Sequence, residues 1–280
     1  MNYGKRKASK KQKRITSKKN MHKKKLGVRL FKGFLLCIFV CCILAAIGGG
    51  FIIKHVIDNA PEITADSIKP QGYTSTALAD DGTTTIAEFT GAGANRVYKT
   101  IDQIPKDLQH AFVAIEDSRF YKHNGIDIQG IIRAFVVGIT HGGNFSEGAS
   151  TITQQLAKNL YFTQEKKMER KVAEVFMAFA LERDYSKNEI LELYVNTIYF
   201  GNGYYCIKDA SEGYFGKEPE DLTDYESTLL AGVPNAPSKY SPTVNLELAE
   251  KRQEQVVERL VACGLFTKER ALETLAGSEM

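Results

Sequence analysis

An uncharged run of 21 residues, from Gly33 to Ile53, separates two charged parts of the chain. A helix rises about 1.5 Å per residue and a bilayer core is about 30 Å thick, so this run is long enough to cross a membrane. The alternative is a cleaved signal peptide, but the run exceeds the usual apolar stretch of about 7–15 residues and follows a very long basic region. The pattern therefore predicts one transmembrane helix over residues 33–53.

The pattern of polar and apolar positions changes again near Ile101. Residues 58–100 lack sustained helical periodicity, and Asp81-Gly82 lies between two threonine-containing runs, which predicts a short hairpin or stem. From Ile101 onward apolar residues recur at helical spacing. We therefore expect a stem over residues 54–100 and a mainly α-helical domain over residues 101–280.

Several helix boundaries can be predicted within this domain. Capping boxes, in which Ser or Thr precedes Glu by three residues, place helix starts at Ser186 and Thr223. Residues 246–275 predict two more helices separated by Gly264, to which we assign no chemistry. The run Gly142-Gly143-Asn144 predicts a loop.

One predicted helix is apolar along a single face. The stripe comprises Ile128, Ile131, Ile132, Phe135, Val136 and Ile139. Such a stripe usually packs into a core. Because the domain is tethered near a bilayer, a surface that dips into the membrane is the alternative, and the sequence leaves both open.

The charge of the chain is divided sharply between its two parts. Residues 1–32 hold 14 Lys and Arg and no acid, whereas the remainder holds 23 Lys and Arg against 33 Asp and Glu. A basic arm directly before a membrane span predicts a cytoplasmic N-terminus and contact with anionic lipids, with everything after Lys54 outside. This placement explains the arm better than nucleic-acid binding does, so we expect no nucleic-acid partner.

The cysteines predict neither a metal site nor an assignable disulfide. Three of the five, Cys37, Cys41 and Cys42, lie within the apolar run. Cys206 and Cys263 lie outside it, and neither has metal-ligand spacing.

The first candidate catalytic group is an acidic pair at the end of an apolar run. Glu116 and Asp117 follow residues 111–115, which are apolar. A carboxyl group leaving a buried segment has a raised pKa and suits general-base catalysis. A helix that ends in solvated acids is the simpler alternative.

A second candidate site is a cluster of cations that follows the polar run GASTITQQ of residues 148–155. It contains Lys158, Lys166, Lys167, Arg170 and Lys171, with Glu174 just beyond. Arg170 and Glu174 are four residues apart and share a helix face. A solvated, salt-bridged helix is one interpretation; the other is a diphosphate site, because cations around a carboxylate can hold two phosphates.

Five sequence blocks, in order, resemble the family 51 glycosyltransferases, the peptidoglycan glycosyltransferases of penicillin-binding proteins. The blocks are EDSRFYKHNGID at 116–127, GASTITQQ at 148–155, RKVAE at 170–174, ILELYVNTIYFGNG at 190–203 and LAGVPNAPSKYSP at 230–242. The likeness covers roughly Asp102 to Pro242, about half the chain. One departure is Cys206, where the family usually has glycine, followed by Asp209 where it tends to alanine.

The resemblance implies a mainly α-helical, lysozyme-like glycosyltransferase domain with a smaller membrane-apposed lobe. It implies an inverting enzyme of the bacterial cytoplasmic membrane that polymerises lipid II into β-1,4-linked glycan strands and releases undecaprenyl diphosphate. Lipid II, the growing glycan strand and membrane lipids would be its partners, together with transpeptidases and other cell-wall synthesis proteins. No organic cofactor is implied, and a divalent cation, Mg²⁺ or Mn²⁺, is a candidate.

The resemblance also implies roles for individual residues. Glu116 would be the general base, and Glu174 would assist at the diphosphate, directly or as the ligand of a divalent cation. The positions that match substrate contacts are Asp117, Phe120, Ser150, Thr151, Gln154, Gln155, Lys158, Lys166, Arg170 and Lys171. For Asp117, Phe120 and His123, shaping the cleft and touching substrate remain equal alternatives.

Two other functions compete with polymerisation. A lytic transglycosylase or muramidase shares the lysozyme-like shape, but cutting a neutral glycosidic bond has no need of the cation cluster. A non-catalytic scaffold that binds lipid II is the third alternative. The chain contains no SxxK and no KTG sequence, so we expect no transpeptidase module within these residues.

Overall fold

The computed structural model describes residues 31–44, 47–51, 75–81, 85–89, 97–140, 150–162 and 168–277, with the single residues 13, 54, 83 and 148. The chain divides into two units, Met1–Asn59 and Ala60–Met280. Nearly all of the basic arm, the Gly142–Asn144 run and Lys166 lie outside the described residues.

The first unit contains one apolar helix, Phe31–Phe51, with a mean hydropathy of 2.6. Its apolar side chains are exposed, as Phe34 and Leu36 illustrate. By length and composition the helix can cross a membrane, in agreement with the span predicted over residues 33–53. Among the described residues it is the single candidate span.

The second unit begins with the predicted hairpin. Strand β1 (Ser75–Leu78) pairs in antiparallel register with β2 (Thr85–Phe89), with Ala77 opposite Ala87. The turn at Asp80 and Asp81 joins them, as the Asp-Gly signal predicts.

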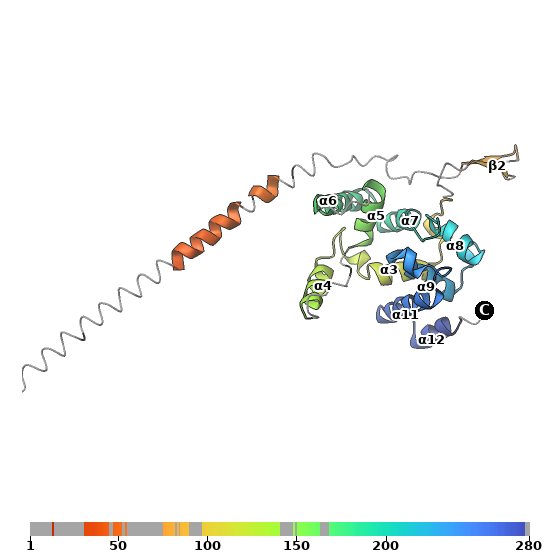
Figure 1. Ribbon diagram of the computed structural model, residues 1–280. Helices are drawn as coiled ribbons and strands as arrows, with labels where there is room; N and C mark the ends of the chain where they lie inside the picture. The colour runs from red at the N-terminus through yellow and green to blue at the C-terminus, as the bar shows by residue number, and fades with distance from the viewer. Residues whose placement is uncertain are drawn as a thin grey trace, which may run out of the picture. The chain divides into compact units, whose positions relative to one another are not determined.

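The rest of the unit is helical, so the mainly α-helical prediction is confirmed. Its elements are η1 (Ile101–Gln103), α3 (Lys106–Glu116), η2 (Phe120–Lys122), α4 (Ile128–Thr140), α5 (Ile152–Tyr161), α6 (Met168–Asp184), α7 (Lys187–Val195), α8 (Ile207–Phe215), η3 (Pro219–Asp221), α9 (Asp224–Gly232), η4 (Val233–Asn235), α10 (Pro237–Tyr240), α11 (Leu246–Ala262) and α12 (Lys268–Ala276). Helices α3, α9 and α11 pack against one another, and α5 packs against α6 and α7 (Figure 1).

The helix starts follow local chemistry. Ser186 and Thr223 cap α7 and α9 through complete capping boxes, as predicted. The two predicted C-terminal helices are α11 and α12, and Gly264 between them has a φ of 71°, which glycine adopts without strain.

Aromatic rings fill the centre of the core. Phe112 of α3 meets Tyr194 of α7 and Phe200 edge to face, with ring centroids 6.1 Å apart in both pairs. All three residues are fully buried. Such pairs contribute about 0.5–1.5 kcal/mol beyond the burial of their area, and they fix α3 against α7.

The apolar stripe of α4 is exposed, so its interpretation as core is wrong. Ile128 is 67% exposed and Phe135 is 58% exposed, and within the helix only Gly130 and Gly138 are buried. Helical periodicity identifies an apolar face but not the medium that covers it. The membrane-dipping alternative from the sequence is therefore the one that remains.

The chain enters the helical domain through residues 97–103, which we call the entry segment. Asn196, the C-cap of α7, accepts a hydrogen bond from Lys99 N at 2.9 Å and donates one to Lys99 O at 2.7 Å. Glu192 accepts from Tyr98 Oη at 2.5 Å and from Ile101 N at 2.6 Å. The fourth sequence block, which contains Glu192 and Asn196, thus holds the entry segment.

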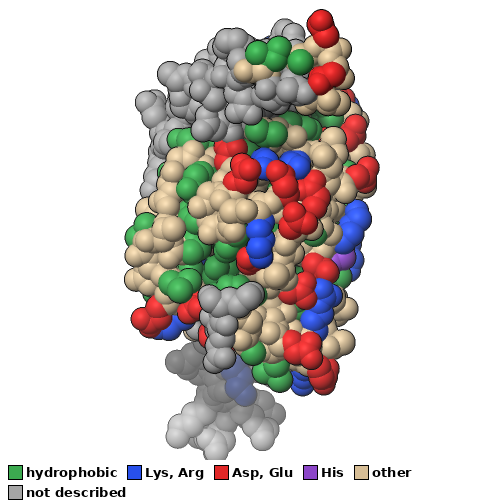
Figure 2. Space-filling model, turned by 90° about the vertical axis from the view of Figure 1, so that its right-hand side faces the viewer, with side chains coloured by type: hydrophobic (Ala, Val, Ile, Leu, Met, Phe, Trp, Pro, Cys, Tyr) green, Lys and Arg blue, Asp and Glu red, His purple; other side chains and the backbone are tan. Residues whose placement is uncertain are grey.

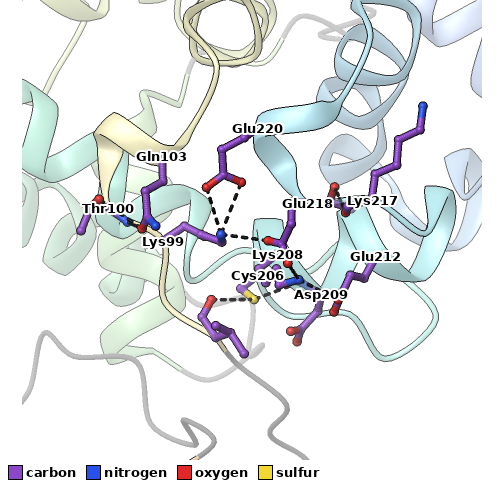
Figure 3. Close-up of polar contacts among 12 residues, drawn as sticks. Lys99, Thr100, Gln103, Cys206, Lys208, Asp209, Glu212, Lys217, Glu218 and Glu220 are labelled. Atoms are coloured by element: carbon purple, nitrogen blue, oxygen red, sulfur yellow. Dashed lines mark hydrogen bonds and ion pairs between the residues drawn. The ribbon is translucent and has the colours of Figure 1, made fainter. Parts of the chain in front are cut away.

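Ion pairs reinforce this attachment (Figure 3). Lys99 lies 2.8 Å from Glu218 and 3.0 Å from Glu220, and Lys208 of α8 contacts both Glu218 and Glu212. Acidic side chains gather, with Lys and Arg among them, on the face seen in Figure 2.

Cys206, which departs from the family pattern, is the N-cap of α8. Its Sγ accepts from Asp209 N at 3.4 Å and lies 3.7 Å from Val97 O (Figure 3). Burial raises the pKa of the Cys206 thiol to about 12. The thiol therefore stays protonated at neutral pH, and its role is structural.

Candidate active site

Glu116 is the last residue of α3, and packing of that helix into the core carries its side chain into a buried position. Only 9% of the side chain is exposed. Gln155 Nε2 of α5 donates to Oε2 at 2.7 Å. The other oxygen, Oε1, is buried and has no hydrogen-bond partner among the described residues.

The electrostatics of Glu116 agree with the prediction from sequence. Burial raises the pKa of the Glu116 carboxyl above its usual range. The hydrogen bond from Gln155 and the charges of Arg252 and Lys158 act in the opposite direction, and burial prevails. A carboxylate in this position is a stronger base than a solvated one.

The carboxylate of Asp117 contacts groups of the fold, His123 and the backbone N–H of Ile152. His123 Nε2 lies 2.9 Å from Oδ1 and 3.0 Å from Oδ2, and Ile152 N donates to Oδ2 at 3.1 Å. Ile152 is the first residue of α5. Although Asp117 lines the cleft, its carboxylate fastens the start of α5 to the end of α3.

The polar residues at the start of α5 are divided between the fold and the cleft. Thr151 Oγ1 accepts from Gln154 N at 3.1 Å, and Gln154 Oε1 accepts from Thr151 N at 3.0 Å, which completes a capping box. Thr151 also donates to Gly125 O at 2.6 Å. These two predicted substrate contacts line the cleft, but they cap α5 with the same polar groups.

The other predicted residues of this part of the chain line the cleft: Ser150, which precedes α5, and Gln155 and Lys158 within it. Ser150 Oγ accepts from Lys171 Nζ of α6 at 2.9 Å, which joins the second and third sequence blocks.

Glu174 is the second buried carboxylate of the cleft, with 1% of its surface exposed. Arg170 Nε lies 3.2 Å from Oε1, and Lys171 Nζ lies 2.8 Å from Oε2. The helical spacing of three and four residues creates both pairs, as the sequence predicts for Arg170. Lys171 and Glu174 line the cleft, whereas Arg170 contacts Glu174 without itself lining the cleft.

The predicted divalent cation does not fit Glu174 in this arrangement. Both carboxylate oxygens are paired with cations, and the described residues contain no group of three or more His, Cys, Asp or Glu side chains that could hold a metal.

Two predicted substrate contacts, Phe120 and Lys166, are not found in the cleft lining of the described residues. Phe120 is fully buried in the hydrophobic core and is absent from the cleft lining in the described part of the chain, so its assignment to substrate is corrected. The Nζ of Lys187 lies 4.3 Å from the centroid of the Phe120 ring. Lys166 lies outside the described residues.

The cleft has a volume of about 800 Å³, and one of its walls was missed by the sequence analysis. Asn235 and Tyr240 of the fifth sequence block lie there, together with four residues of α11 from the region to which no chemistry was assigned: Arg252, Gln255, Glu258 and Arg259. Arg252 and Arg259 are seven residues apart on α11, and this i, i+7 spacing is the signal that could have found them.

Comparisons with known proteins agree with the five blocks. The transglycosylase family profile matches residues 82–261. Penicillin-binding protein 1F of Bacillus subtilis is 46% identical over 178 residues, which are 64% of this chain and 25% of that protein. Penicillin-binding protein 1A of Escherichia coli is 38% identical over 246 residues, which are 87% of this chain and 28% of that protein.

A solved structure is also similar. It is the crystal structure of penicillin-binding protein 1A from Haemophilus influenzae, with a TM-score of 0.41 and 23% identity over 78% of this chain and 21% of that one. The chain thus spans about a quarter of the length of the curated relatives it matches.

Proposed function

This chain belongs to the transglycosylase family, and from that premise we propose that it is a peptidoglycan glycosyltransferase. Its reaction is the polymerisation of lipid II into β-1,4-linked glycan strands, with release of undecaprenyl diphosphate. The growing strand is the donor and a new lipid II is the acceptor. Transpeptidases and other cell-wall synthesis proteins are the partners we expect.

One observation carries the proposal: a single cleft holds two buried carboxylates in opposite environments. Glu116 has a raised pKa and one oxygen without a hydrogen-bond partner among the described residues, whereas Glu174 is held between Arg170 and Lys171. Two carboxyl groups whose surroundings differ in this way take different roles in catalysis. The first suits proton transfer, and the second suits the organisation of positive charge.

In the proposed mechanism Glu116 removes the proton from the acceptor hydroxyl as its oxygen attacks the anomeric carbon of the donor. The bond from that carbon to the diphosphate breaks, and the electron pair leaves with the diphosphate. Attack opposite the leaving group inverts the anomeric centre. A positioned base contributes about 100- to 10,000-fold, because a sugar hydroxyl is a poor nucleophile at neutral pH.

The charge of the second site matches the leaving group. Arg170 and Lys171 exceed Glu174 by one positive charge, and Lys158 in the cleft adds another. The departing diphosphate gains negative charge, and fixed cations stabilise that charge without reorganisation. The role of Glu174 is to hold Arg170 and Lys171 in place.

The membrane features support a lipid-linked substrate. The Phe31–Phe51 helix suits a single-pass anchor, and the exposed stripe of α4 suits insertion into the outer boundary of the bilayer. The basic arm orients the N-terminus to the cytoplasm. The cleft then works at the external face of the bacterial cytoplasmic membrane.

The test is polymerisation of labelled lipid II by wild type and by Glu116→Gln. We expect Glu116→Gln to fold and to bind lipid II, but to lose about 100-fold or more in turnover. Retention of more than about a tenth of wild-type turnover would contradict the base assignment. Glu254→Gln, an exposed glutamate of α11, is the matched control and should retain activity.

The same assay separates the alternative functions. A lytic enzyme would shorten preformed glycan and leave lipid II intact. A scaffold would bind lipid II without making or cutting polymer. Either result for the wild type would refute the proposal.

A further inference from the structure

Arg252 of α11 is positioned beside Glu116 by contacts at its aliphatic stem and at its guanidinium head. A Cβ at Gly232 would lie 3.0 Å from Arg252 Cγ, so the glycine leaves room for the arginine stem. At the head, Nη1 donates to Gln255 Oε1 at 2.7 Å, and Cζ lies 5.9 Å from the centroid of the Tyr240 ring. The side chain is only 13% exposed. The guanidinium therefore has a defined position in the cleft.

Arg252 and Glu116 approach one another without making a direct hydrogen bond. The distance from Arg252 Nη2 to Glu116 Oε1 is 4.0 Å, which exceeds the range of a hydrogen bond. Glu116 Oε1 has no hydrogen-bond partner among the described residues, while Gln155 satisfies Oε2. The unused acceptor oxygen therefore faces a donor that is just out of reach.

The spacing fits one intervening oxygen atom. An oxygen at about 2.7–2.8 Å from both Nη2 and Oε1 would see them at an angle of about 90°, close to the arrangement around a hydroxyl oxygen. A hydroxyl group donates one hydrogen bond and accepts others, so it can satisfy both atoms at once. A group that only accepts hydrogen bonds could not satisfy Oε1, and one that only donates could not accept from Nη2.

We propose that Arg252 is a further catalytic residue, which donates a hydrogen bond to the acceptor hydroxyl while that hydroxyl gives its proton to Glu116. This inference rests on the proposed function and assigns the acceptor's position within it. The hydroxyl proton passes to Glu116 Oε1, one oxygen lone pair accepts from Arg252 Nη2, and the other lone pair forms the bond to the anomeric carbon. The electron pair of the broken bond leaves with the diphosphate. With two contacts fixed, the attacking lone pair has one direction left.

The experiment compares Arg252→Met, Arg252→Lys and the control Lys251→Ala in the full-length protein. Methionine keeps an unbranched stem against Gly232 but removes the donor and the charge, whereas lysine keeps a donor and the charge. Lys251 is on the same helix, is 60% exposed and pairs with Glu247, so its removal matches the loss of charge. The measurements are turnover of lipid II across pH, thermal melting, and affinity for moenomycin, a phosphoglycolipid inhibitor that mimics the donor diphosphate.

We expect Arg252→Met to lose at least about tenfold in kcat, as befits a lost charge-assisted hydrogen bond, and Arg252→Lys to recover part of the loss. The acid limb of the Met profile should move to higher pH, because the charge of Arg252 lowers the pKa of Glu116. Moenomycin affinity should stay within about threefold of wild type, because the cations of α5 and α6 are unchanged.

Three results would overturn the inference. One is turnover by Arg252→Met within about threefold of Lys251→Ala. A second is a parallel fall in moenomycin affinity and turnover, which would place Arg252 at the donor diphosphate. The third is an inactive wild type, which would refute the proposed function as well and is thereby distinguished. If Arg252→Met fails to fold, Arg252→Gln is judged by the same criteria.

Discussion

Replacing Asp117 by asparagine tests whether this carboxylate acts on substrate or on the fold. Asp117 receives two buried donors, His123 Nε2 at 2.9 Å and Ile152 N at 3.1 Å. Asparagine offers one oxygen in place of two, so one of the donors would face an amide NH₂ group. Only 7% of Asp117 is exposed, so water cannot easily replace the lost acceptor.

The cost follows from these contacts. A buried donor left unsatisfied costs about 1–3 kcal/mol, and loss of a charge-assisted bond adds to it, so we expect a loss of about 2–4 kcal/mol in the free energy of unfolding. For a domain of this size each kcal/mol lowers Tm by about 2–4 °C. Asp117→Asn should therefore melt about 5–15 °C below wild type.

The assay is thermal melting by circular dichroism beside lipid II turnover at a temperature where both proteins are folded. Turnover should fall moderately, because α5 shifts and carries Gln155 away from Glu116. The control is Asp184→Asn, which breaks an exposed pair with Arg183 and should leave Tm close to that of wild type, because solvent screens such pairs. Abolished turnover with an unchanged Tm would refute the structural role and return Asp117 to the substrate.

Three further predictions concern charge and topology. Lys158→Ala combined with Arg170→Ala should abolish polymerisation and weaken moenomycin binding by about 1.5–3 kcal/mol per lost contact, without strict additivity. Circular dichroism should show an intact fold. Unchanged moenomycin affinity in the folded double variant would show that these cations do not bind the diphosphate. Burial raises the pKa of Glu116, so its ionisation lowers the stability of the fold as pH rises through that pKa. Glu116→Gln should therefore be more stable than wild type at neutral pH and lose this advantage in acid. Denaturant titrations that show an equal advantage at both pH values would contradict this sign. In a cysteine-free variant, a new thiol in the basic arm should not react with a membrane-impermeant thiol reagent added to intact cells, whereas a new thiol at Ser278 should react. The reverse pattern would contradict the predicted topology.

Local signals in the sequence were sufficient to predict much of the fold. The capping boxes at Ser186 and Thr223 and the Asp-Gly hairpin are confirmed, because each depends on residues within four positions of one another. The Arg170–Glu174 pair is confirmed for the same reason.

Features that depend on distant packing were not predictable in this way. The stripe of α4 has a core-like period, but periodicity does not specify whether protein or another apolar medium covers it. Phe120 belongs to a block rich in functional residues, yet its ring packs into the core. Arg252 joins Glu116 only because α11 packs against α3, a contact that no local pattern encodes.

The entry segment also has a mechanical consequence. Tension applied to the chain from its N-terminal side reaches the helical domain at residues 97–103, only a few residues before α3 begins at Lys106. The hydrogen bonds of Asn196 and Glu192 to the entry segment, together with the Lys99 ion pairs, lie between the point where the force is applied and the helix that carries Glu116. These contacts would break before the pulling force reaches α3, so the position of Glu116 would be preserved under moderate tension. In single-molecule pulling, Asn196→Ala should release the segment at lower force than wild type, and an unchanged force would show that the load is borne elsewhere.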